Sequence, residues 1–141
     1  MRKKIAIIQD DIDLNEFYKK IISGGGFDCC CFTNAEDFEK EIFEKEDEFS
    51  LILSDYLLPG KNGIDLFLSL NSRGIFLPFI LITGINDINL AIKALKLGVS
   101  DFILKPVDKE HLLNLIKKYL KIEESQKIAD LYKIQEDIVV K

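Results

Sequence analysis

Short apolar runs alternate along the chain with segments in which apolar residues recur at helical spacing, and few folds are compatible with this pattern. The apolar runs cover residues 5–8, 29–32, 51–53, 79–82 and 102–104, and each has the length of a buried strand. The helical stripes are Leu14, Phe17, Tyr18, Ile21 and Ile22; Phe38 and Ile42; Ile64, Phe67 and Leu68; Ile88, Ile92 and Leu95; and Leu112, Ile116 and Tyr119. We therefore predict five strands that alternate with five helices.

Regular alternation of nearly continuous apolar strands with helices is typical of a parallel sheet that is covered by helices on both faces. We expect an α/β fold with a doubly wound, five-stranded parallel sheet in the order 2-1-3-4-5, the flavodoxin-like (βα)5 arrangement. Ligands of such sheets bind beyond the carboxyl ends of the strands. The residues that follow each predicted strand are therefore the candidate functional residues.

Composition narrows the class of protein further. The chain has 141 residues, 48% of them hydrophobic and 30% charged, which suits one globular domain. The longest nearly uncharged apolar stretch, residues 74–85, contains Pro78 and is shorter than the ~20 residues that span a membrane. The N-terminus lacks the apolar region of a signal peptide, so we expect a cytoplasmic protein without membrane contact. The net charge of −5 argues against direct binding of nucleic acid.

Polar residues stand at the ends of four of the predicted strands. Asp10 and Asp11 follow the first strand, Asp55 ends the third, Thr83 ends the fourth and Lys105 follows the fifth. Because strands 1, 3, 4 and 5 are successive neighbours in the predicted order, we expect these side chains to converge at one edge of the sheet.

Three converging carboxylates repel each other unless a cation neutralises them. Oxygen ligands without His or Cys favour a hard ion, and Mg²⁺ typically binds one or two carboxylates together with phosphate oxygens. A metal-neutralised carboxylate can attack a phosphoryl group and form an aspartyl phosphate. Lys105 and Thr83 would then offer an ammonium and a hydroxyl group to the phosphoryl oxygens. The pattern therefore predicts a Mg²⁺-dependent phosphoryl site.

Over residues 3–120 the sequence resembles the receiver domain of bacterial two-component response regulators. The matching elements are the Asp10-Asp11 pair, the segment SDYLLPGKNG at 54–63, Thr83-Gly84, and DFILKP at 101–106. Their order along the chain and their positions at strand ends make the combination specific. The resemblance implies a phosphorylated signalling domain with no turnover of an external substrate.

The resemblance also implies a role for each site residue. Asp55 corresponds to the phosphoacceptor, with Lys105 and Thr83 as the residues that bind the phosphoryl group. The implied Mg²⁺ ligands are Asp10, Asp11, Asp55 and the backbone carbonyl of Leu57. The Lys105-Pro106 bond is expected to be cis, as is usual in that family.

A switch and a set of partners follow from the same resemblance. Phosphorylation in the family draws the threonine, here Thr83, inward, and the aromatic residue at the position of Phe102 turns into the vacated space. This remodels the face formed by the fourth helix, the fifth strand and the fifth helix. The implied phosphoryl donor is a sensor histidine kinase or a phosphotransfer protein, and a homodimer could form through this face or the C-terminal segment.

Residues 121–141 extend beyond the receiver, which we assign to residues 1–120. Ile128, Leu131 and Ile138 fall near heptad spacing, although Gln135 interrupts the stripe. Two interpretations stay open: a helix that pairs with another subunit, or a linker to an output domain.

Three alternative functions share features with the receiver. A phosphate-independent interaction module of the same fold would be expected to have lost an acid or the lysine. A phosphatase of the haloacid dehalogenase type would use the Asp11-Ile12-Asp13 segment as its Asp-x-Asp, but it leaves the loop after Asp55 unexplained. A flavodoxin-like FMN carrier needs a Ser/Thr/Gly-rich phosphate loop where this chain has acids.

Overall fold

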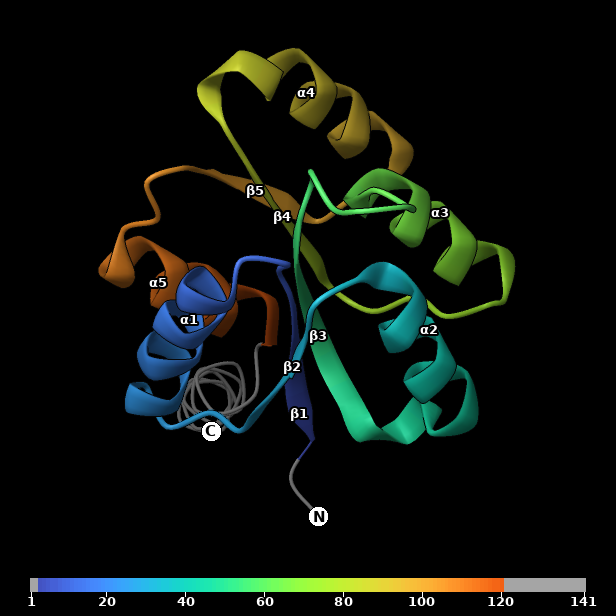
Figure 1. Cartoon of the computed structure of the whole chain (residues 1–141), viewed down its shortest axis with the longest axis horizontal. Helices are drawn as coiled ribbons and strands as arrows, with labels where there is room; N and C mark the ends of the chain where they lie inside the picture. The colour runs from blue at the N-terminus through green and yellow to red at the C-terminus, as the bar shows by residue number, and fades with distance from the viewer. Residues whose placement is uncertain (1–2, 121–141) are drawn as a thin grey trace, which may run out of the picture.

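A computed structural model of the chain describes residues 3–120 as a single parallel sheet between two layers of helices (Figure 1). The strand order is β2-β1-β3-β4-β5, as predicted. The strands are β1 (Lys4–Ile8), β2 (Cys29–Phe32), β3 (Phe49–Asp55), β4 (Phe79–Thr83) and β5 (Asp101–Leu104). The helices are α1 (Ile12–Gly24), α2 (Ala35–Glu44), α3 (Gly63–Ser72), α4 (Ile88–Leu97) and α5 (Lys109–Leu120), with 3-10 turns at Glu46–Glu48 and Ile85–Asp87. The predicted extension 121–141 lies outside the described residues, so both interpretations of it stay predictions.

Alternate residues of each strand feed two separate hydrophobic cores. On β1, Ile5 and Ile7 join the core under α1 and α5, whereas Ala6 and Ile8 join the core under α2, α3 and α4. This follows from the two-residue period of a strand, which sends successive side chains to opposite faces. Figure 1 shows the same division, with α1 and α5 on one side of the sheet and the other three helices opposite.

Polar side chains fix where most of the helices begin. Asp11, Asn34 and Asn62 each accept a hydrogen bond from a backbone N–H three residues later, at the starts of α1, α2 and α3. Asp108 does the same for the N–H of His111 at the start of α5. Such caps satisfy backbone donors that have no partner inside the helix.

The buried side of α4 differs from the apolar stripe that predicted the helix. Ile92 and Leu95 belong to that stripe but are 43% and 37% exposed, whereas Ala91 and Ala94 are fully buried. The helix therefore packs through its smallest side chains, and its larger apolar residues lie outside. The stripe correctly located a helix but gave the wrong face for the sheet contact.

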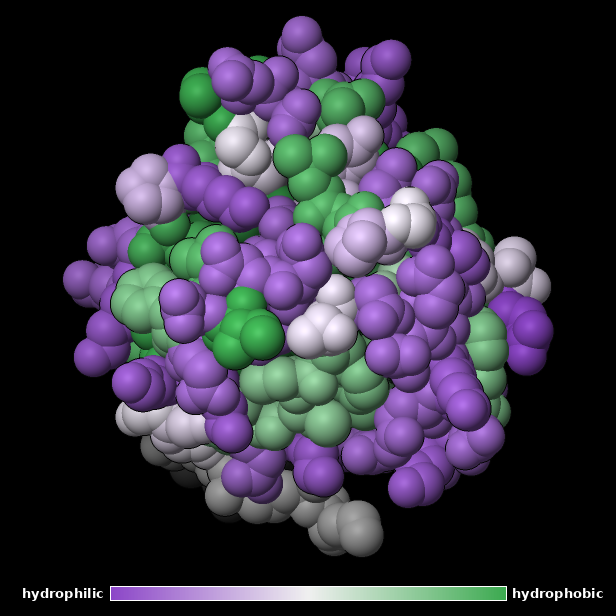
Figure 2. Space-filling view, in the orientation of Figure 1, coloured by the Kyte–Doolittle hydropathy of each residue, from purple (hydrophilic) through white to green (hydrophobic). Residues whose placement is uncertain are grey.

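The cysteines at 29–31 form most of the edge strand β2 and pair in register with Ile5, Ala6 and Ile7 of β1. All three are free thiols. Figure 2 shows a pale green strip where β2 lies in Figure 1, with hydrophilic surface on both sides. Their spacing, which fits neither a disulfide framework nor a metal motif, is thus explained by a strand. Among residues 3–120, no helix is both long enough and apolar enough to cross a membrane.

An aromatic cluster under α2 provides a test of the core. Phe38 is fully buried and makes edge-to-face contacts with Phe32 and Phe49, at centroid distances of 5.1 and 5.2 Å. We expect Phe38→Ala to lower the free energy of unfolding by about 3–5 kcal/mol, because it leaves a cavity and removes these contacts. Phe76→Ala is the matched control, since Phe76 is 74% exposed, and it should change stability by less than about 0.5 kcal/mol. Urea denaturation measures both, and equal effects would contradict this packing.

Candidate functional site

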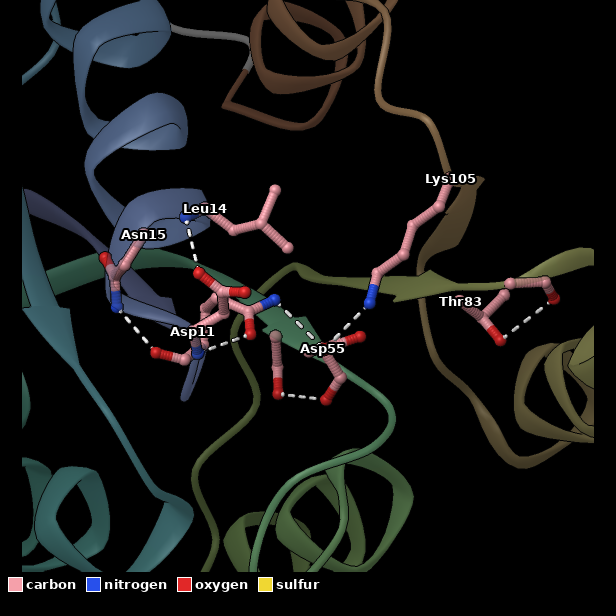
Figure 3. A network of polar contacts seen from close by, with 9 residues as sticks. Asp11, Leu14, Asn15, Asp55, Thr83 and Lys105 are labelled. Atoms are coloured by element: carbon pink, nitrogen blue, oxygen red, sulfur yellow. Dashed lines mark hydrogen bonds and ion pairs between the residues drawn. The ribbon is translucent and has the colours of Figure 1, made fainter.

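The sheet brings the candidate residues to one edge, at the carboxyl ends of neighbouring strands (Figure 3). Asp55 is the last residue of β3 and Thr83 the last of β4, and Lys105 directly follows β5. Backbone hydrogen bonds extend the ladder past these ends, from the Tyr56 N–H to Ile82 O at 2.8 Å and from the Lys105 N–H to Thr83 O at 2.9 Å. Strand register therefore fixes the backbone positions of the site.

Asp55 is the centre of the site, because its carboxylate is buried and paired. The residue is 3% exposed, and its Oδ2 atom accepts hydrogen bonds from Lys105 Nζ and Gln9 Nε2, each at 3.0 Å. A buried carboxylate without partners is strongly unfavourable, so a cation and an amide donor at one oxygen stabilise it. Neither contact uses Oδ1. Figure 3 shows Lys105 reaching toward Asp55 from the side of β5.

Gln9 was not among the residues that the sequence predicted for the site. It follows β1 directly and is 1% exposed, and its Oε1 accepts a hydrogen bond from the Asp11 N–H at 2.9 Å. The backbone of Gln9 is held as well, because Asn15 Nδ2 donates to its carbonyl at 2.8 Å. Its position directly after a buried strand could have identified Gln9 as a site residue. The prediction instead selected the two acids that follow it, Asp10 and Asp11.

Asp10 and Asp11 do not join Asp55 in the cluster that the sequence predicted. Both are exposed, and Asp11 Oδ1 accepts the Leu14 N–H at 3.1 Å as the cap of α1. Within residues 3–120, no group of three or more His, Cys, Asp or Glu side chains is arranged to hold a metal ion. Asp11 turns toward its own helix in this arrangement (Figure 3), and the metal-binding role of the three carboxylates stays a prediction.

Thr83, Phe102 and Leu57 lie on β4, on β5 and in the loop after β3. Thr83 is 2% exposed, and its hydroxyl makes a long hydrogen bond of 3.5 Å to the carbonyl of Gly84. Phe102 is half-buried against the core under α2, α3 and α4. Leu57 lies in the loop after β3 with its side chain 62% exposed. The Lys105-Pro106 bond is cis, as the resemblance predicted.

Polar contacts hold the loop that follows β3 against α2 and α3. Lys61 Nζ lies 2.7 Å from Glu39 Oε1, and the Ser69 hydroxyl donates to Glu39 Oε2 at 2.7 Å. Glu39 is 8% exposed, so its charge is buried but fully partnered. The loop that carries Leu57 is thus fixed at its far end by groups on both neighbouring helices.

Tyr18 lies beneath the same site on the side of α1. Burial first, and then the carboxylates of Asp55 and Asp11, raise the pKa of Tyr18 to about 12, while a side-chain hydrogen bond with Gln9 opposes the rise. The hydroxyl therefore stays protonated at neutral pH. Tyr18 acts here as a neutral neighbour of Gln9 and Asp55.

Comparison with known proteins assigns the chain to a family. Residues 5–117 match the response regulator receiver domain. The chain belongs to this family. The receiver is 38% identical over 117 residues to the phosphoglycerate transport system transcriptional regulatory protein PgtA of Salmonella typhimurium, covering 83% of this chain and 28% of that protein. It is 34% identical over 121 residues to the transcriptional regulatory protein CrdR of Helicobacter pylori, covering 84% and 55%. The chain thus spans only part of these relatives.

Solved structures agree with this assignment. A response regulator receiver domain protein from Clostridium thermocellum superposes with a TM-score of 0.81 at 20% identity, covering 88% of this chain and 98% of that one, which supports the fold. Full-length FixJ from B. japonicum gives a TM-score of 0.79 at 26% identity and covers 99% and 67%. The predicted flavodoxin-like receiver fold is confirmed, and the chain is a receiver domain of the two-component response regulator type. The phosphatase and flavin-carrier alternatives are not favoured.

The start of α3 approaches the backbone of Asp55 so closely that only glycine fits there. A Cβ atom on Gly63 would lie 2.5 Å from the Asp55 carbonyl oxygen and 2.9 Å from Leu81 Cδ1. We expect Gly63→Ala to lower the free energy of unfolding by about 1–3 kcal/mol, because α3 or β3 must move. Urea denaturation tests this.

Gly24→Ala is the matched control, since nothing lies within 4 Å of a Cβ atom at this last residue of α1. It should leave stability unchanged or raise it by about 0.4–1 kcal/mol. A Gly63→Ala variant as stable as Gly24→Ala would contradict the close approach of α3 to Asp55.

Proposed function

We propose that Asp55 accepts a phosphoryl group from the phosphohistidine of a sensor histidine kinase or phosphotransfer protein. The observation that carries the proposal is the buried Asp55 carboxylate, which lies at the end of the central strand with an ammonium group 3.0 Å away. A carboxylate oxygen of Asp55 forms the new P–O bond while the P–N bond to the histidine breaks, and the imidazole leaves. The chain changes its own phosphorylation state and turns over no external substrate.

Lys105 supplies a positive charge both before and during the transfer of the phosphoryl group. Before transfer, its ammonium group pairs with Asp55 Oδ2 and offsets the burial of the carboxylate. During transfer, negative charge spreads over the phosphoryl oxygens, and a fixed cation beside them lowers the energy of that state. Thr83 ends the neighbouring strand and offers a hydroxyl donor to the same oxygens.

Receiver domains generally depend on Mg²⁺, and the oxygen donors at this edge suit that ion. We propose that Asp10, Asp11, Asp55 and the backbone carbonyl of Leu57 hold it, with Asp11 contributing the carboxylate oxygen that does not cap α1. When bound, the ion would neutralise the carboxylates and the incoming phosphoryl oxygens. All four donors are oxygens, as a hard cation requires.

The proposed output of phosphorylation is a change in the face formed by α4, β5 and α5. Thr83 and Lys105 are joined by a backbone hydrogen bond, so movement at Thr83 also acts on β5, the strand that contains Phe102. We propose that Phe102 turns inward when Thr83 is drawn toward the phosphoryl group. We also propose that two copies of the chain can form a homodimer through this face.

Phosphorylation of the isolated chain tests the proposal directly. Incubation with acetyl phosphate and Mg²⁺ should add one phosphoryl increment to the intact mass, and hydroxylamine should remove it, because acyl phosphates are labile to this nucleophile. Asp55→Asn should abolish the increment, since an amide is a poor nucleophile. Removal of Mg²⁺ with a chelator should abolish it as well.

Asp65→Asn is the matched control, because it removes an exposed carboxylate on α3 and should leave the increment unchanged. Stoichiometric labelling of Asp55→Asn would contradict the assigned acceptor. A folded wild type that takes up no phosphoryl group would instead favour a phosphate-independent interaction module.

A further inference from the structure

Gln9 connects the start of α1 to the proposed phosphoacceptor through both ends of one side-chain amide. Its Nε2 lies 3.0 Å from Asp55 Oδ2, and its Oε1 lies 2.9 Å from the Asp11 N–H. The side chain is almost completely buried, so water does not compete for either contact. A buried polar group satisfied at both ends has one favoured position and little freedom to leave it.

Elementary hydrogen-bond chemistry fixes which end of the amide faces Asp55. The backbone N–H of Asp11 can only donate, so the amide atom beside it must be the oxygen Oε1. The NH₂ group then faces Asp55, whose ionised carboxylate can only accept. The two contacts therefore support each other, and rotating the amide by half a turn would lose both.

The backbone N–H and carbonyl groups of Gln9 are also hydrogen-bonded. Asn15 Nδ2 donates to the carbonyl of Gln9 at 2.8 Å and to the carbonyl of Phe32 at 3.0 Å. The N–H of Gln9 donates to the Phe32 carbonyl at 2.9 Å. Gln9 is thus tied to β2 and α1 before its side chain reaches Asp55, which makes it a rigid support.

We infer that Gln9 is a positioning residue that holds Oδ2 of Asp55 and thereby presents Oδ1 to the incoming phosphoryl group. This inference rests on the proposed function of Asp55. Lys105 and Gln9 donate to the same oxygen, so that oxygen is occupied while Oδ1 is used by neither. A neutral amide performs this role without adding a further negative charge beside the carboxylate. Holding a nucleophile in one orientation lowers the barrier to transfer, because less ordering remains to be done in the reaction.

Gln9→Met tests the inference, because it removes the donor and keeps a side chain of similar length. At saturating Mg²⁺ and acetyl phosphate, we expect the maximal rate of labelling to fall roughly tenfold or more. The carboxyl ¹³C resonance of Asp55 should also shift in the absence of metal and donor, since the carboxylate loses a hydrogen bond. Intact mass and NMR provide the two measurements.

Ser100→Ala is the matched control for a purely structural role. It removes the hydrogen bond that the Phe79 N–H donates to the Ser100 hydroxyl at 3.0 Å, at the start of β4 and at the opposite end of that strand from Thr83. We expect it to lower the thermal midpoint while leaving both the maximal labelling rate and the Asp55 resonance as in the wild type. If Gln9→Met fails to fold, Gln9→Glu replaces it, because its carboxylate still accepts the Asp11 N–H.

Gln9→Glu places a second carboxylate beside Asp55, and a cation relieves the repulsion between them. The half-saturating Mg²⁺ concentration should therefore fall several-fold, as followed by the Asp55 resonance. A Gln9→Met variant with the wild-type rate and resonance, or a Gln9→Glu variant with unchanged Mg²⁺ dependence, would overturn the inference alone. A folded wild type that is never labelled would overturn the proposed function and the inference with it.

Discussion

The buried charge of Asp55 is the constraint on which the organisation of the site depends. A carboxylate that is 3% exposed needs partners, and β3 lies in the middle of the sheet with structure on both sides. One partner comes from the side of β5, as the ammonium group of Lys105, and the other comes from the side of β1, as the amide of Gln9. The Asp55 carboxylate is therefore stabilised by two residues that are distant from it in the sequence.

The parallel register of the sheet makes these long-range contacts possible. Asp55 pairs with Ile82 of β4, Thr83 pairs with Leu104 of β5, and Ile8 pairs with Ser54. The carboxyl ends of β1, β3, β4 and β5 therefore lie at nearly the same level. The residues at or directly after the ends of neighbouring strands lie side by side. A slip of one residue would turn Asp55 to the opposite face and separate it from Lys105 and Gln9. The same hydrophobic alternation that fills the two cores therefore also fixes the site.

The sequence predicted the sheet well because the alternation of apolar runs with helical stripes is a local and repetitive signal, and the strand order followed from the fold that this alternation favours. It also located Asp55, Thr83 and Lys105, since each stands at or directly after the end of an apolar run. It did not predict how the acids after β1 would divide their roles. Asp11 has a strong local alternative as the cap of α1, and no pattern in a single sequence shows which way a side chain turns.

The packing of α4 could not be predicted for a related reason. Larger apolar residues at helical spacing indicate a helix, but they indicate its buried face only where the sheet leaves room for them. Here the sheet accepts Ala91 and Ala94, and Ile92 and Leu95 stay outside. The prediction from spacing assumes that the largest apolar side chains of a helix are the buried ones. This assumption fails for α4, because its buried face consists of the small side chains of Ala91 and Ala94.

α4 follows Thr83 closely in the chain and contacts the sheet through two buried alanines. Side chains cap the starts of α1, α2, α3 and α5, but Asp87 makes no such bond at the start of α4. Burial of alanines removes less apolar surface from water than burial of leucine or phenylalanine, so less free energy holds the helix in place. In the proposed switch, a small movement at Thr83 would therefore shift α4 at low cost. The exposed apolar side chains of α4 would carry that shift to a partner, which links the buried acceptor to the proposed signalling face.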